Sequence, residues 1–410
     1  MPHEIHHVPA PAARLTGVGT AVLALACGLL AANLYYAQPL TGLIGAELHM
    51  PPTITGLFVT LTQLGYGLGL LFVVPLGDLL ENRRLVSVLV GIAATALLGL
   101  YLCPSAGLFL AFTLVVGIGA TTVQVLLPFA AHFASDADRG RVIGTLTSGL
   151  MLGILFARPL ASLETYYLGW RAIFATAAVA LAVLALVLGA TMPPRRPASF
   201  LGYRGILGSL PRLWQELPLL RRRTAYHAAL YASFSLFWTA VPLLLAGPGF
   251  GLTQREIALF ALAGAGGVVI APVAGWIADN GWTRPATGLA IGSVLLSFAV
   301  AFLGGTVGSV IALAVAAVLV DIGLVTNFVL SQRAIYGMRP DARSRIGGLF
   351  TAIFFTGGAA GSLAATASLA TGGWQLTATL GAGLASAALL VYATELRPAR
   401  AGAVTAPPTA

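Results

Sequence analysis

The sequence predicts an all-α membrane protein with twelve transmembrane helices in two six-helix bundles, and three observations support this fold class. Hydrophobic residues make up 58% of the 410-residue chain and charged residues only 9%, whereas a soluble domain carries about 25% charged residues. The apolar runs are about twenty residues long, which is the length that an α-helix needs to cross a bilayer. The longest polar stretch lies near the middle of the chain, with six apolar runs on either side.

The apolar runs favour helices over the strands of a membrane barrel. Inside hydrocarbon every backbone amide needs an internal partner, so only helices and closed barrels can span a bilayer. Barrel strands would be about ten residues of alternating polarity, whereas these runs are longer and continuously apolar. We therefore expect spans near residues 17–43, 53–77, 85–103, 106–133, 142–163, 169–190, 224–246, 254–278, 285–304, 307–332, 346–371 and 373–394.

The polar stretch at 192–223 divides the chain into segments. We expect a cytoplasmic tail at 1–16, a six-helix bundle at 17–191, a basic linker at 192–223, a second bundle at 224–394 and a second cytoplasmic tail at 395–410. The linker mixes apolar residues with arginines, which is typical of a helix that lies on a membrane surface. These residues are Phe200, Leu201, Ile206, Leu207 and Leu210, with Arg204, Arg212 and the cluster Arg221–Arg223.

The positive charges predict the orientation in the membrane. The formal net charge is +9, and all 22 basic residues are arginines that lie mostly in short connections between apolar runs. This placement indicates topology rather than nucleic-acid binding. With the amino terminus in the cytoplasm, 19 arginines fall on that side, Arg171 and Arg255 fall outside, and Arg158 lies within a span. The positive-inside rule then places both termini and the linker in the cytoplasm.

Matched loops in the two halves indicate an internal duplication. The loop after the second span contains Asp78 and Arg83, and the loop after the eighth contains Asp279 and Arg284 with the same spacing, 201 residues later. The loops DADRGR and DARSR, after the fourth and tenth spans, also resemble each other. Such a parallel repeat is typical of transporters that rock one half against the other.

These loops resemble the signature of the major facilitator superfamily, and the resemblance covers essentially the whole chain. VPLGDLLENRR (74–84) matches the signature at Asp78, Arg83 and Arg84, and departs from it at Val74, Leu79, Glu81 and Asn82. The second copy, GWIADNGWTR, keeps Gly275, Asp279 and Arg284. The stretches NLYYAQPL, GILFARP and GWTRPATG are similar to a bacterial branch of arabinose-efflux-like and multidrug-efflux-like permeases.

The resemblance implies a multi-pass secondary transporter of the bacterial inner membrane with a gate at the cytoplasmic ends of its helices. Carboxylates and arginines of the matched loops can pair across a closed interface and separate when the halves rock. In the alternative interpretation these arginines only hold the topology. The expected gate residues are Asp78, Arg83, Arg84, Arg139, Arg141, Asp279 and Arg284.

Small residues recur at helical spacing in the four spans that, by resemblance, join the two halves. They are Gly65 with Gly69, Gly149 with Gly153, Gly264 with Gly267, and Gly357 with Gly361. The spacing puts each pair on one helix face, where backbones can approach closely. Either static packing or sliding between the halves explains them.

Polar residues inside apolar spans point to a substrate path, because leaving them unpaired in lipid costs several kcal/mol. By resemblance, the first, fourth, seventh and tenth spans line a central cavity, and most of these residues lie on them. Each residue by itself could equally serve as an interhelical hydrogen bond. The candidates for substrate binding are Asn33, Tyr36, Gln38, Gln63, Tyr66, Gln124, Tyr231, Trp238, Asn327 and Ser331. Their mixture of aromatics and neutral amides suits a moderately apolar organic solute.

Arg158 and Asp321 are opposite charges placed deep within spans. By resemblance, the span of Arg158 borders the other half, so the two side chains could pair between the halves and part as the cavity opens. A carboxylate that is alternately paired and freed changes its proton affinity, which is what coupling requires. In the alternative, Arg158 reaches outward and Asp321 is hydrated in the cavity. Drug–proton antiporters often carry an arginine at the position of Thr113. The proton relay of those antiporters therefore cannot be carried over directly to this sequence.

The predicted function is secondary active transport by alternating access, and the resemblance implies proton-coupled efflux of a small, moderately apolar organic compound. The alternatives are a proton symporter that imports a sugar or carboxylate and, from another class, a non-transporting receptor or scaffold. No P-loop is present, which argues against ATP drive, and we expect no cofactor, metal site or enzymatic activity. Substrate, protons and membrane lipid are the expected partners of a functional monomer. Four cysteines and histidines without a metal-ligand spacing are interpreted as packing residues, namely Cys27, Cys103, His132 and His227. Three further histidines, His3, His6 and His7, are interpreted as part of the tail.

Overall fold

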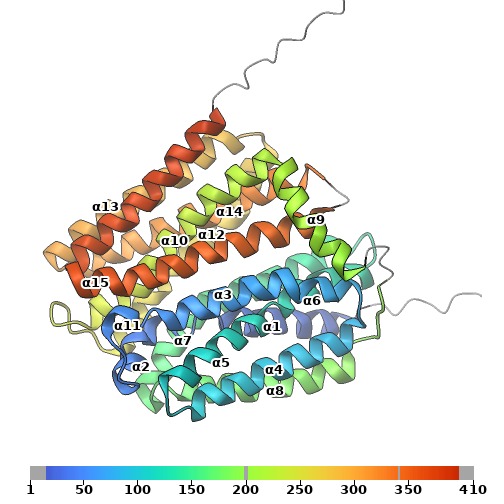
Figure 1. Ribbon diagram of the computed structural model, residues 1–410, viewed down its shortest axis with the longest axis horizontal. Coiled ribbons are helices and arrows are strands. Elements are labelled where there is room, and N and C mark those ends of the chain that lie inside the picture. Colours follow the sequence, from blue (N-terminus) through green and yellow to red (C-terminus); the bar gives the residue numbers. More distant parts are fainter. Residues whose placement is uncertain (1–14, 198–201, 340–341, 397–410) are drawn as a thin grey trace, which may run out of the picture.

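The computed structural model describes residues 15–197, 202–339 and 342–396, and these residues form helices and their connections without a β-strand (Figure 1). The predicted all-helical membrane fold is confirmed. Both tails, with His3, His6, His7 and Arg14, lie mostly outside the described residues, as do Phe200 and Leu201 of the linker.

Among the residues that the structure describes, the first half contains eight α-helices. They are α1 (Gly17–Ala32), α2 (Thr41–Glu47), α3 (Leu57–Phe72), α4 (Asn82–Leu102), α5 (Ala106–Ala120), α6 (Thr122–Phe133), α7 (Arg139–Leu168) and α8 (Ala172–Thr191). Three short 3-10 helices adjoin them, η1 (Gln38–Leu40), η2 (Pro52–Ile54) and η3 (Val74–Asp78).

Within the described residues, the linker and the second half contain seven α-helical segments. They are α9 (Tyr203–Glu216), α10 (Pro218–Ala246), α11 (Gln254–Ala261), α12 (Ala265–Asp279), α13 (Thr283–Val307), α14 (Val310–Tyr336) and α15 (Arg343–Leu396), with η4 (Leu262–Gly264) between α11 and α12. The last of them is two helices joined at Gly373, whose φ of 66° and ψ of −165° break the helical path. Glycine adopts this backbone conformation without the steric cost that a side chain would impose.

The twelve expected spans all fall on helical segments. Within the described residues, ten segments are long and apolar enough to cross a membrane, and α15 is one segment that contains two of the expected spans. The first expected span contains the shorter apolar helix α1, of 16 residues, and then continues through a turn into η1 and α2. Large apolar side chains point away from the protein on these helices, such as Leu186, Leu289 and Ile311, which are 76%, 75% and 78% exposed.

The two halves repeat the same packing order. In the first half α1 packs on α7, α3 on α5 and α4 on α8. In the second half α10 packs on the first part of α15, α12 on α14, and α13 on both α14 and α15. The halves meet where α3 packs on α15 and where α7 packs on α11, and they lie side by side in Figure 1. The duplication predicted from the loops is therefore also present in the arrangement of the helices.

The glycine pairs pack helices within each half rather than between the halves. A Cβ atom on Gly149 would lie 2.3 Å from the carbonyl oxygen of Ala24, and one on Gly153 would lie 2.1 Å from that of Gly28, so both bring α7 onto α1. The other pairs behave alike, with Gly65 and Gly69 against α5, Gly264 and Gly267 against α14, and Gly357 and Gly361 against α10. Of the two alternatives, static packing describes this structure, because the closest backbone approaches of these glycines hold each bundle together.

We expect Gly153→Ala to destabilise the protein by about 1–3 kcal/mol, the usual cost of forcing atoms into a packed interior. The added methyl group would push α7 away from the backbone of Gly28. Gly144→Ala is the matched control on the same helix, since a Cβ atom there meets nothing within 4 Å. Thermal unfolding in detergent measures both variants, and equal unfolding temperatures would contradict this role of Gly153.

The second bundle begins earlier and ends later than expected. Helix α10 starts at Pro218 rather than near residue 224, and the last helix reaches Leu396. Arg223 is therefore not an exposed linker residue, since its side chain is 2% exposed and its Nη2 atom lies 2.6 Å from Oε1 of Glu395, which is 8% exposed. The sequence pattern missed this pair because Glu395 follows the last apolar run.

Candidate transport site and gates

Most of the candidate substrate residues are buried, and Gln63, Tyr66 and Tyr231 contact the opposite half. Gln38, Asn327 and Ser331 have no exposed surface, and Gln63 and Trp238 are 1% exposed. Asn33, Tyr36, Tyr66 and Tyr231 are also buried, while Gln124 is partly buried. The expected central cavity is thus closed around these side chains in this structure.

Hydrogen bonds cross between the halves at this site. The hydroxyl groups of Tyr35 and Tyr231 lie 3.3 Å apart, and Nε2 of Gln63 donates to Oγ of Ser235 at 3.0 Å. Tyr35, rather than the predicted Tyr36, makes the contact with Tyr231. Tyr35 and Tyr36 are consecutive in the stretch NLYYAQPL. The backbone turn that follows α1 decides which of the two side chains faces Tyr231.

A second group of hydrogen bonds closes the interface near the beginning of α3. The Thr60 hydroxyl donates to the carbonyl oxygen of Ala359 at 2.9 Å, and the Ser362 hydroxyl donates to that of Gly56 at 3.1 Å. The backbone N–H of Gly56 donates to the Thr366 hydroxyl at 3.2 Å. These bonds join α3 and the turn before it to α15, so this end of the interface is closed.

Arg158 and Asp321 approach each other from opposite halves, but they do not form the expected direct ion pair. No contact of 4.0 Å or less between their nitrogen and oxygen atoms occurs among the described ion pairs. Trp238 lies between them, with its Nε1–H donating to Oδ1 of Asp321 at 3.0 Å. The guanidinium carbon of Arg158 lies 4.4 Å from the centre of the Trp238 ring. The indole therefore bridges the two charges.

The remaining surroundings of Arg158 are neutral. Its Nε donates to Oε1 of Gln38 at 2.8 Å, and its guanidinium also lies over the rings of Tyr35 and Phe234, at 4.8 and 5.3 Å. Cation–π contacts of a desolvated arginine contribute about 2 kcal/mol. Arg158 is only 4% exposed, so the alternative in which it reaches outward does not describe this structure.

Aromatic rings from the second half form a wall beside this site. The Tyr231 ring lies 4.9 Å from the rings of both Phe354 and Phe355, and the Tyr66 ring of the first half lies 4.4 Å from Phe355. His227 packs within the same wall, with its Nδ1 atom 2.9 Å from Oδ1 of Asn327. Phe354 and Phe355 were not predicted as site residues, because phenylalanine in an apolar span has no polar signal.

Five of the predicted site residues contain a buried polar atom without a hydrogen-bond partner. These atoms are Asn33 Oδ1, Gln38 Nε2, Gln63 Oε1, Arg158 Nη2 and Asn327 Nδ2. Buried polar atoms in native proteins nearly always have a protein or water partner. Gln63 crosses between the halves, and Gln38 bonds the Arg158 side chain beside that contact, so these unpartnered atoms indicate a site that water or a polar ligand completes.

Most of the predicted gate residues form local pairs. Arg83 and Arg84 contact Glu81 rather than Asp78, Arg139 contacts Asp136, and Arg141 contacts Asp138. Asp279 pairs with Arg333 of α14 rather than with Arg284, at 2.5 Å. Each of these pairs lies within one half, so none of them links the two halves in this arrangement.

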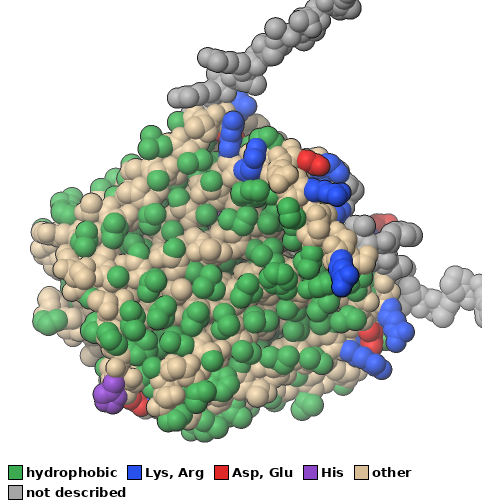
Figure 2. All heavy atoms as spheres, in the orientation of Figure 1, with side chains coloured by type: hydrophobic (Ala, Val, Ile, Leu, Met, Phe, Trp, Pro, Cys, Tyr) green, Lys and Arg blue, Asp and Glu red, His purple; other side chains and the backbone are tan. Residues whose placement is uncertain are grey.

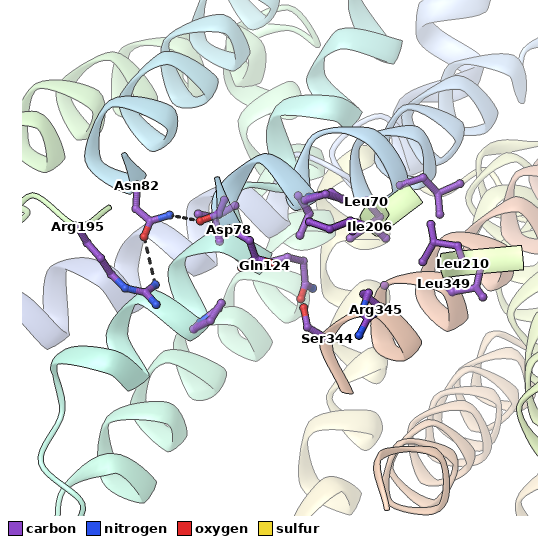
Figure 3. A pocket seen from close by; sticks show the side chains of 17 residues that line it. Leu70, Asp78, Asn82, Gln124, Arg195, Ile206, Leu210, Ser344, Arg345 and Leu349 are labelled. Atoms are coloured by element: carbon purple, nitrogen blue, oxygen red, sulfur yellow. Dashed lines mark hydrogen bonds between the residues drawn. The ribbon is translucent and has the colours of Figure 1, made fainter. Parts of the chain in front are cut away.

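Asp78 is the predicted gate residue that lies between the halves. It lines a small cavity of about 50 Å³ with Arg195 of the linker and Arg345 of α15 (Figure 3). Nη1 of Arg195 donates to Oδ1 of Asn82 at 3.2 Å, and the backbone N–H of Asn82 donates to the carbonyl oxygen of Arg195 at 2.9 Å. Burial lowers the pKa of Arg195, and the Asp78 carboxylate acts in the opposite direction. The sequence pattern did not single out Arg195, because it is one of seven linker arginines.

Two repeated helical bundles with paired polar groups across their contact define a membrane transporter that works by relative movement of its halves. The chain belongs to the Major Facilitator Superfamily, whose family model matches residues 21–362. It is therefore a secondary transporter and not an enzyme, as the sequence predicted. The finer assignment to an arabinose-efflux-like or multidrug-efflux-like branch stays a prediction.

Sequence relatives cover nearly the whole chain. It is 37% identical over 371 residues to the uncharacterized transporter YgaY of Escherichia coli O157:H7, covering 90% of this chain and 94% of that protein. It is 34% identical over 385 residues to the probable transporter SCO4007 of Streptomyces coelicolor, covering 92% and 87%. These relatives are bacterial, and this chain is a multi-pass membrane protein.

Solved structures with low sequence identity share the fold. A mutant of the nucleoside transporter NupG has a TM-score of 0.74 at 13% identity, covering 92% of this chain and all of that chain (100%). A bacterial homologue of the human lysosomal transporter Spinster, in an inward-facing and unoccupied conformation, has a TM-score of 0.69 at 14% identity, covering 92% and 94%.

Proposed function

We propose that this transporter exports a small, moderately apolar organic compound in exchange for protons, by alternating access. The observation that carries the coupling is the connection from Arg158 through Trp238 to Asp321, which crosses the contact between the halves. Movement of α7 away from α10 would remove the guanidinium from the indole that holds the carboxylate. Asp321 then gains or loses a proton as its surroundings change, because a nearby cation favours the charged form of a carboxylate.

The surroundings of the site support the substrate class. Tyr66, Tyr231, Phe354 and Phe355 offer aromatic surface for an apolar body. The unpartnered atoms of the neutral amides offer a few directed hydrogen bonds, which is the usual composition of an organic ligand site. Gln63 supplies one such atom, and the same side chain joins the two halves.

We also propose that both termini and the linker face the cytoplasm of a bacterial inner membrane. Support comes from the arginines, which gather at the end of the molecule that contains α9 (Figure 2). The positive-inside rule assigns such an end to the cytoplasm. A carboxy-terminal fusion to a fluorescent protein would fluoresce in that orientation, whereas a fusion to alkaline phosphatase would be inactive. The reverse pattern would overturn the orientation.

The experiment that tests export compares the growth of cells with and without the protein across a panel of inhibitory organic compounds. Export predicts that the expressing cells tolerate at least one compound better, and import predicts the opposite sign. Proteoliposomes with an imposed proton gradient then test coupling for that compound. A compound that moves at the same rate with and without the gradient would refute proton coupling.

A second candidate is a proton symporter for a carboxylate, and one observation favours it. Arg158 is buried without a carboxylate in contact, and both its Nη2 atom and the Nε2 atom of Gln38 lack an acceptor. A bound carboxylate would supply acceptors for both donors, and a proton on Asp321 would relieve the repulsion between the two acids. Uptake of an aromatic carboxylate that increases with an inward proton gradient would select this candidate over export.

At the gate, we expect Asp78→Asn to slow transport more than Asp279→Asn. Asp78 lies between the halves, whereas Asp279 and Arg333 are both 56% exposed and belong to the same half. An exposed pair of this kind contributes only about 0.2–1 kcal/mol. Transport rates normalised to protein in the membrane measure the difference. A larger loss in Asp279→Asn would place the gate elsewhere.

A further inference from the structure

An apolar groove lies where the linker helix α9 meets both halves. Its volume is about 370 Å³, and apolar residues alone line it, from α3, α9 and α15. Leu71 and Phe72 come from the first half, and Leu349 and Ile353 come from the second. Phe72 is 48% exposed, so the groove can be reached from outside the protein.

Helix α9 bridges the two halves above this groove. At its beginning, the Tyr203 hydroxyl donates to the carbonyl oxygen of Phe72 in the first half at 2.8 Å. At its end, Glu216 lies 3.7 Å from Arg339 of the second half. Figure 1 shows α9 crossing from one set of helices to the other at one end of the molecule. The groove therefore exists only while both halves and the linker keep this arrangement.

The two arginines of α9 take different positions relative to the groove. A helix turns about 100° per residue, so Arg204 lies about 20° from Pro211 and 60° from Leu207, two residues of the groove lining. Arg212 lies about 140° from Leu207, on the far side of the helix. Both arginines are exposed, and neither takes part in the ion pairs found within the described residues. Arg204 thus places a positive charge at the edge of the groove.

We propose that the groove binds an acyl chain of an anionic phospholipid, with the lipid phosphate at Arg204. An amphipathic helix of this kind lies in the interface region of a bilayer, where acyl chains meet head groups. Apolar walls that water would otherwise cover favour a hydrocarbon occupant, and the arginine attracts the negative head group. Because the walls come from both halves, the bound lipid stabilises this arrangement relative to others.

Tryptophan fluorescence provides the test, because Trp214 of α9 lines the groove. The full chain is placed in phosphatidylcholine nanodiscs that contain increasing fractions of phosphatidylglycerol with brominated acyl chains, which quench nearby tryptophans. Subtracting the spectrum of Trp214→Phe in the same discs isolates the contribution of Trp214. Brominated phosphatidylcholine at the same fractions forms the zwitterionic arm.

We expect half-maximal quenching of Trp214 at an about fivefold lower fraction of phosphatidylglycerol than of phosphatidylcholine, the factor that one arginine near an anionic head group contributes. Arg204→Gln should remove this preference, and the matched control Arg212→Gln should keep it. Equal quenching by both lipids, or equal effects of the two variants, would overturn the proposal. Absence of any quenching of Trp214 would also overturn it. The measurement needs no transport, so its outcome is independent of the proposed export.

Discussion

Asp321→Asn should abolish gradient-driven transport while preserving exchange of substrate across the membrane. The neutral amide can still accept the hydrogen bond from Trp238, but it cannot take up a proton during the cycle. We therefore expect the gradient-driven rate to fall to the rate measured without an imposed gradient, because the variant loses coupling and keeps the contact with Trp238. Proteoliposomes loaded with the compound found by growth profiling measure both modes, with and without an imposed proton gradient.

Three further variants test the pathway between the charges. Trp238→Phe keeps an aromatic ring beneath Arg158 but removes the N–H donor, so it should weaken coupling less than Asp321→Asn. Arg158→Gln should impair the same step, and the double variant with Asp321→Asn should be no worse than the worse single variant, because the residues act together. Full gradient-driven activity in Asp321→Asn would end the proposed role of this carboxylate.

Arg223→Ala should destabilise the second half by about 3–5 kcal/mol, the cost of leaving one member of a buried ion pair without its partner. The Glu395 carboxylate would keep its contact with the Tyr226 hydroxyl, at 3.3 Å. Its side chain is only 8% exposed, so water could not replace the lost arginine. Helix α10 and the end of α15 would then separate. Thermal unfolding in detergent, together with the yield of monodisperse protein, measures the loss.

Neighbouring residues provide the controls for this pair. Arg221 and Arg222 are exposed on the same helix turn, so their alanine variants should change stability by no more than about 0.5 kcal/mol. The double variant Arg223→Met with Glu395→Leu should recover much of the lost stability, because apolar replacement of a buried ion pair is often neutral. An Arg223→Ala protein as stable as Arg221→Ala would show that the pair does not hold these helices together.

Some features of the site could be read from residue type and position. Polar residues in apolar spans identified Gln38, Arg158 and Asp321, and the structure brings all three to the contact between the halves. Polarity could not distinguish Tyr35 from its neighbour Tyr36, and it could not find Phe354 and Phe355, which are not polar. Aromatic residues serve equally well in lipid contacts, cores and binding sites, and only the positions of neighbouring helices decide between them.

The ion-pair partners of charged residues were the least predictable part of the candidate site. Asp78 and Arg83 are close in sequence, yet Arg83 contacts Glu81, and Asp78 faces Arg195 and Arg345 from distant segments. A carboxylate can pair with any arginine that its rotamers reach. Proximity along the chain therefore accounts for the pair of Arg83 and Glu81, but it does not account for the surroundings of Asp78, where several segments converge.

The sequence by itself determined the fold class, the number of apolar runs, the division into two repeated halves and the placement of the arginines. These features follow from the bilayer, which requires every span to be helical, apolar and about twenty residues long. Only the tertiary structure decided that the glycine pairs hold each bundle together, that Trp238 separates Arg158 from Asp321, and that Arg223 is buried against Glu395. These features depend on which helix faces are in contact, and the bilayer imposes no such choice, because lipid and a neighbouring apolar helix are equally apolar surroundings.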